Sequence, residues 1–136
     1  MKRVVLDTSV LVSAFIGSPD AAPSRVTRAA IEERYRLVLS LRLLDELNDV
    51  LSRPKFARQA GDGRATRFVA ALLRVAELHV DAPDPPAITR DPEDDYLIAL
   101  AQLAVADLLV SVDRDLLEAD PPLTIVTPAE LLDRLT

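Results

Sequence analysis

Two aspartates follow predicted β-strands directly, and this placement could bring their carboxylates together. Asp7 comes after the β-branched run Arg3–Leu6, and Asp113 comes after the apolar run at residues 108–112. In an open α/β sheet the ligand crevice lies beyond the carboxyl ends of the strands, so both acids are expected at one crevice. The alternative for a single strand-end aspartate is a turn or a helix cap. Two of them at equivalent positions weaken that alternative.

The chemistry that suits such a cluster is metal-assisted. Carboxylates crowded together repel one another unless protons or a divalent cation neutralise them, and hard oxygen ligands suit Mg²⁺ or Mn²⁺. The chain has no cysteine and a single histidine, His79. Thiolate chemistry is therefore excluded, and a tetrahedral zinc site would have only His79 as a nitrogen ligand. His79 lies in an apolar run, where a packing role is favoured over catalysis.

Further acids lie on two predicted helices. On the helix predicted over residues 41–53, Glu46 borders the leucine stripe, whereas Asp45 and Asp49 lie further from it. Glu46 is thus the acid best placed to point inward, and an ordinary boundary charge is the alternative. The segment at residues 91–95 holds four acids. Because the helix dipole alone favours acids in a first turn, spacing does not choose among them.

The elements that must position these acids alternate between strand and helix. Further predicted strands lie at residues 37–39, 78–80 and 123–126, and further helices at residues 24–34, 64–77 and 96–105. Ser40 is placed to cap a helix, Pro92 stands at a first helical position, and Thr127 with Glu130 forms a capping box. The alternation predicts a three-layer α/β/α fold with a central, mostly parallel sheet.

Composition and charge limit the class of protein. The apolar share of 49% is enough to bury a core, and residues 1–136 are expected to form one domain. Because no run approaches the roughly 20 apolar residues of a membrane helix, a soluble, cytoplasmic protein without a membrane partner is expected. Residues 1–74 hold 13 Lys and Arg against 8 Asp and Glu, whereas residues 75–136 hold 3 against 14. This asymmetry indicates either an uneven solvated surface or an acidic metal pocket beside an arginine-rich substrate face.

Four segments together resemble the acidic motifs of PIN-domain nucleases, over essentially the whole chain. The run V-V-L-D-T-S-V-L-V-S-A at residues 4–14 resembles the family's opening. Residues 44–51, 91–101 and 106–117 resemble its later motifs in the same order, and T-P-A-E-L-L at residues 127–132 resembles its usual ending. The chain departs from the commoner pattern at Val105, where glycine is frequent, and at Ser111 and Val112.

The resemblance implies the site residues and their roles. The implied acidic quartet, with a fifth candidate and a reserve, is Asp7, Glu46, Asp95 and Asp113, then Asp115, then Asp94. The aspartates Asp7, Asp95, Asp113 and Asp115 would hold Mg²⁺ or Mn²⁺. Glu46 would orient or deprotonate the attacking water, and Ser9 would orient Asp7 or hold a metal-bound water. Arg25, Arg28 and Arg42 are candidates for phosphate contacts.

The function that the resemblance implies is a metal-dependent endoribonuclease that hydrolyses RNA phosphodiester bonds. The family includes VapC-type toxins, so a toxin–antitoxin pair, a cognate antitoxin protein and a homodimer are expected. A PIN-fold nuclease of RNA maturation and a non-catalytic RNA- or protein-binding module remain alternatives. Loss of the acids would mark the binding module, and none is lost. A phosphotransfer fold with the same opening needs a second aspartate where Ser9 stands or a lysine in the second half, which the chain lacks.

Overall fold

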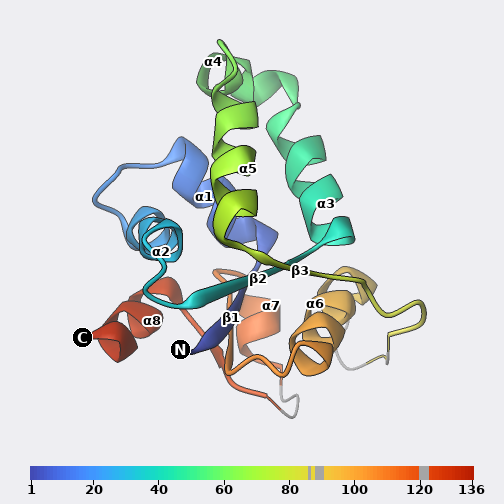
Figure 1. The fold of residues 1–136 in the computed structure, drawn as a ribbon. Coiled ribbons are helices and arrows are strands. Elements are labelled where there is room, and N and C mark those ends of the chain that lie inside the picture. The colour runs from blue at the N-terminus through green and yellow to red at the C-terminus, as the bar shows by residue number, and fades with distance from the viewer. Residues whose placement is uncertain (86, 88–90, 120–122) are drawn as a thin grey trace.

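A parallel sheet of five strands lies at the centre of the computed structural model, which describes residues 1–85, 87, 91–119 and 123–136. Within that part of the chain the strand order is β3-β2-β1-β4-β5, and every neighbouring pair is parallel (Figure 1). The strands are β1 (Arg3–Leu6), β2 (Arg36–Ser40), β3 (Glu77–His79), β4 (Leu108–Val110) and β5 (Ile125–Val126). The predicted α/β class is confirmed, and the described sheet is wholly parallel.

Helices cover both faces of this sheet. They are α1 (Thr8–Ile16), α2 (Ala22–Ile31), α3 (Leu41–Leu51), α4 (Ala57–Ala60), α5 (Arg64–Val75), α6 (Pro92–Leu103), α7 (Arg114–Leu117) and α8 (Pro128–Leu135), with a 3₁₀ turn η1 (Pro54–Phe56) before α4. In Figure 1, α1, α3 and α5 lie on one side of the sheet and α6 lies on the other. No helix among the described residues is long and apolar enough to cross a membrane.

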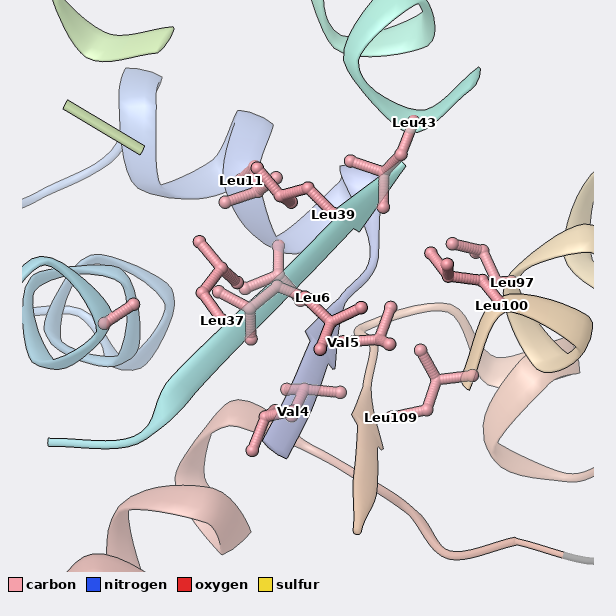
Figure 2. Packing of buried hydrophobic residues seen from close by; sticks show 14 of the residues in the cluster. Val4, Val5, Leu6, Leu11, Leu37, Leu39, Leu43, Leu97, Leu100 and Leu109 are labelled. Atoms are coloured by element: carbon pink, nitrogen blue, oxygen red, sulfur yellow. The ribbon is translucent and has the colours of Figure 1, made fainter. Parts of the chain in front are cut away.

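The core is built on the central strand β1. Its residues Val4, Val5 and Leu6 are completely buried, as expected for a parallel strand covered on both faces. Figure 2 shows Leu97 and Leu100 of α6 facing the sheet, with Leu11 of α1 on the opposite side. β1 pairs with both β2 and β4, so the register of these two pairs determines where β2 and β4 end relative to β1.

Several predicted boundaries differ from the structure. The helix predicted to residue 34 ends at Ile31, because the chain turns at Glu33 with a positive φ of 58°. The strand predicted over residues 108–112 ends at Val110, and the strand predicted over residues 123–126 covers only Ile125–Val126. The four-residue helices α4 and α7 were not predicted, because two periodic apolar positions carry too little signal.

Local capping signals, in contrast, are confirmed. Ser40 Oγ accepts a hydrogen bond from the Leu43 amide, and Thr127 and Glu130 form both halves of the capping box. Val105, at the position where the family often has glycine, adopts a φ of 51°. A β-branched residue is strained in that left-handed region, so the turn between α6 and β4 keeps the glycine conformation without the glycine.

Candidate active site

Asp7 lies at the carboxyl end of β1 and caps the next helix. Its amide donates to the Val110 carbonyl oxygen at 2.9 Å, so it still belongs to the sheet edge. Its side chain caps α1, and Oδ2 accepts hydrogen bonds from Ser9 Oγ at 2.9 Å and from Ser111 Oγ at 2.7 Å. The carboxylate is only 6% exposed. Two hydroxyls therefore fix one of its oxygens.

Ser111 connects Asp7 to Asp113. The fully buried Ser111 hydroxyl donates to Asp7 and also accepts from the Asp113 amide at 2.9 Å. Asp113 in turn caps α7, because its Oδ1 accepts from the Asp115 amide at 2.9 Å. One buried hydroxyl thus sets the relative position of two acids that are 106 residues apart in the sequence (113 − 7).

Glu46 reaches the same region from α3. Its Oε2 accepts a hydrogen bond of 2.5 Å from the Tyr96 hydroxyl, and the Arg42 guanidinium lies over the Tyr96 ring, 4.1 Å from its centroid. Burial, followed by the hydrogen bond and charge of Glu46, raises the pKa of Tyr96 well above its ordinary value. Tyr96 therefore stays protonated and acts as a hydrogen-bond donor to the carboxylate.

Asp94 and Asp95 occupy different places, although they are neighbours in the sequence. Both are buried, at 7% and 4% exposure. Asp94 lines a pocket with Asp7 and Asp113, whereas Asp95 is not among its lining residues. Burial, followed by the charges of Asp113, Asp7, Asp91 and Asp115 in that order of size, raises the pKa of Asp94 to about 6. The reserve candidate Asp94 therefore shares the pocket with Asp7 and Asp113.

The pocket gathers residues from both ends of the chain. Its volume is about 480 Å³, and its lining residues are Asp7, Thr8, Ser9, Val12, Ser13, Glu46, Val50, Arg53, Asp91, Asp94 and Asp113. We call it the carboxylate pocket. Asp115 does not line it, and its backbone amide donates a hydrogen bond to Asp113 Oδ1. None of Arg25, Arg28 and Arg42 lines it, and among the described residues its basic lining residue is Arg53.

Sequence reasoning missed three contributors to this region and left Asp91 unresolved among the four acids of residues 91–95. The three are Arg53, Ser111 and Tyr96. The position of Ser111 two residues before Asp113, like that of Ser9 two residues after Asp7, is a signal that could have identified it. Tyr96 carried no such signal, because its hydroxyl meets Glu46 only through tertiary packing.

The donor set of the carboxylate pocket suits a hard cation. Carboxylate and hydroxyl oxygens are ligands for Mg²⁺ or Mn²⁺, and a cation would relieve the repulsion that raises the pKa of Asp94. In the described part of the chain, no three histidine or acidic side chains converge closely enough to form a complete metal site as they stand. The pocket therefore has the type of ligand atom that such an ion prefers, and Asp7, Asp94 and Asp113 are the residues that could hold it.

Comparison with known proteins identifies the fold and the family. The sequence profile of the PIN domain matches residues 3–115, which include all the acids of the pocket. The chain belongs to the PIN domain family. PIN domains are generally nucleases, so a hydrolase role follows in coarse terms. The PIN fold of the chain resembles the crystal structure of PAE2754 from Pyrobaculum aerophilum, with a TM-score of 0.66 and 21% identity over 98% of this chain and 89% of that one. No curated protein matches the chain.

Proposed function

We propose that this PIN domain is a Mg²⁺- or Mn²⁺-dependent endoribonuclease that hydrolyses RNA phosphodiester bonds. The observation that carries the proposal is the carboxylate pocket, where Asp7, Glu46, Asp94 and Asp113 line one hollow at the carboxyl ends of β1 and β4. This is the edge at which open parallel sheets bind ligands. With Asp91, five acids among the described residues line the pocket, and a purely structural role gives no reason to gather them, because their mutual repulsion costs stability.

Asp7, Asp94 and Asp113 would hold the ion. When bound, such an ion activates water and stabilises the negative charge that develops at the phosphate. Asp94 takes the place that the resemblance gave to Asp95, because Asp94 lines the pocket and is raised in pKa by Asp113 and Asp7. Asp115 adds negative charge near the pocket, and its charge is the smallest of those that raise the pKa of Asp94.

The remaining residues prepare the reacting groups. Ser9 and Ser111 hold Asp7 Oδ2, so the carboxylate keeps one orientation. Glu46 orients or deprotonates the attacking water, and Tyr96 orients the Glu46 carboxylate by donating a hydrogen bond. Arg53 is the basic lining residue that can meet a phosphate.

The test compares cleavage of structured and single-stranded RNA in Mg²⁺ or Mn²⁺ with cleavage in EDTA. Asp7→Asn removes one acid of the pocket, and Asp45→Asn makes the same change at an exposed site of α3. We expect cleavage by the wild-type protein and by Asp45→Asn, and none in EDTA or with Asp7→Asn. Equal cleavage by a cleanly purified, folded Asp7→Asn protein would remove the proposal.

We further propose that the ribonuclease is the toxin of a VapC-type toxin–antitoxin pair, acting in the cytoplasm as a homodimer. The resemblance of four ordered motifs supports this. Expression in a host without the antitoxin should arrest growth, and Asp7→Asn should relieve the arrest. Normal growth with active protein present would assign the nuclease to RNA maturation instead.

A further inference from the structure

Three arginines gather in a groove between α1, α2 and α5. Two adjoining hollows of about 390 and 310 Å³ share Phe15, Arg64 and Phe68 among their lining residues, and Arg67 lines the first and Arg28 the second. We call this surface, defined by these five residues, the arginine groove. None of the described residues that line either hollow is acidic. The arginine groove is therefore positive, although the chain as a whole carries a net charge of −6.

The arginines of this groove are held by neutral groups. Arg28 Nη2 donates to the Pro19 carbonyl oxygen and Arg67 Nη1 to the Asp62 carbonyl oxygen, each at 2.8 Å. Within the described residues, neither of them nor Arg64 takes part in an ion pair. The guanidinium groups of Arg28 and Arg67 are thus held by backbone carbonyl oxygens, and no ion pair among the described residues compensates the three charges.

Helix stability does not explain two of these arginines. Arg64 and Arg67 stand in the first turn of α5, which carries no acid. The amino-terminal end of a helix is the positive end of its dipole, so basic residues there are unfavourable. Positions that cost stability and keep a positive charge are typical of an anion-binding surface.

The arginine groove continues from the carboxylate pocket along α1. Val12 lines the pocket, and Phe15, one helical turn later, lines the groove. Phe15 is eight residues beyond Asp7, the N-cap of α1, which corresponds to about 12 Å along the axis. At roughly 3.4 Å per nucleotide of a stacked strand, three or four nucleotides span that distance.

We propose that the arginine groove binds the single-stranded flank of the RNA whose scissile phosphate lies in the carboxylate pocket. This inference rests on the proposed ribonuclease function. Arg28, Arg64 and Arg67 contact phosphates, and Phe15 with Phe68, whose ring centroids lie 5.1 Å apart, forms an apolar floor for a base. Continuity with the pocket favours RNA over an acidic protein segment as the occupant.

The test measures binding of a fluorescently labelled, mixed-sequence single-stranded RNA of 20 nucleotides by anisotropy. The protein is the full chain in EDTA, so no cleavage interferes. Arg64→Glu with Arg67→Glu reverses two charges of the groove, and this change favours the helix because acids suit a first turn. Arg36→Glu with Arg58→Glu is the matched control, since both side chains are exposed and line none of the hollows described above.

We expect the groove variant to weaken RNA binding at least tenfold at about 0.1 M salt. The slope of log Kd against log salt should fall by about 1.4, because each phosphate contact of a single strand contributes roughly 0.7. Shortening the RNA to four nucleotides should weaken binding to the wild-type protein but hardly affect the groove variant. The control variant should match the wild type.

Three outcomes would overturn the proposal. Equal losses in the groove and control variants would show a general charge effect, and unchanged binding by the groove variant would place the strand elsewhere while leaving the ribonuclease intact. If the groove variant keeps its RNA affinity but loses binding to a labelled polyglutamate peptide, the occupant is an acidic protein segment. Cleavage assays separate the two proposals, since a wild-type protein that neither binds nor cuts RNA fails both.

Discussion

The Ser111 hydroxyl donates to Asp7 Oδ2 at 2.7 Å and at the same time accepts from the Asp113 amide. Ser111→Ala removes both hydrogen bonds and leaves a buried carboxylate oxygen with one donor fewer. We expect the free energy of unfolding to fall by about 2 kcal/mol and cleavage to fall about tenfold. Thermal unfolding and cleavage rates measure the two effects. Ser52→Ala, at an exposed hydroxyl on the end of α3, should change neither. Full activity of Ser111→Ala would show that Asp7 keeps its orientation without this bridge.

A pair of variants compares Asp95, which the family resemblance implies, with Asp94, which lines the carboxylate pocket. Because Asp94 lines the carboxylate pocket and Asp95 does not, Asp94→Asn should reduce metal-dependent cleavage by about a hundredfold or more. Asp95→Asn should leave much of the cleavage intact in the fraction that folds. Circular dichroism of both variants, followed by cleavage assays, is the measurement. The reverse order of activities would restore Asp95 to the acidic quartet.

The raised pKa of Asp94 also predicts a pH-dependent stability in the absence of metal. Its pKa of about 6 lies above the ordinary value, so its contribution is fully present at low pH and is lost as pH rises through about 6. In EDTA at pH 7.5, Asp94→Asn should therefore raise the unfolding free energy by about 1 kcal/mol and the Tm by about 4 °C. The gain should shrink as pH is lowered towards 5. A gain that is constant with pH would contradict this origin.

Tyr96→Phe should change the pH profile of cleavage. The Tyr96 hydroxyl donates 2.5 Å to Glu46 Oε2 and so stabilises the ionised carboxylate. Without it, the acidic limb of the pH–rate profile should move to higher pH by about one unit. A role limited to packing would lower the Tm and leave the profile in place.

Val105 provides a prediction about stability alone. Its φ of 51° is unfavourable for a β-branched residue, and its side chain is 76% exposed, so little packing is lost on truncation. Val105→Gly should raise the free energy of unfolding by about 1 kcal/mol without affecting cleavage. Urea denaturation measures this, and a lower midpoint would show that the turn is not strained.

Sequence reasoning succeeded where the signal is local or periodic. The apolar runs around Leu6 and Leu39 predicted buried parallel strands, and Thr127 with Glu130 predicted the last helix start. It failed at Glu33, because a non-glycine residue with positive φ gives no warning in the sequence. It also overextended β4 to residue 112, since Val112 extends the apolar pattern although the strand ends at Val110.

The site could be predicted in its strand-end members but not in its details. Asp7 and Asp113 follow from the parallel topology, because adjacent strands end at the same edge. The sequence did not show that Asp94 lines the pocket, because α6 is apolar on too many sides for its periodicity to show which side faces it.

The position of β1 at the centre of the sheet has a consequence for synthesis on the ribosome. Its neighbours are residues 36–40 on one side and residues 108–110 on the other. A nascent chain that has not yet exposed β4 holds Asp7 and Glu46 but neither Ser111 nor Asp113, so the acids of the pocket are incomplete. The pocket is therefore completed late in translation, and a ribosome-bound fragment lacking β4 cannot form it.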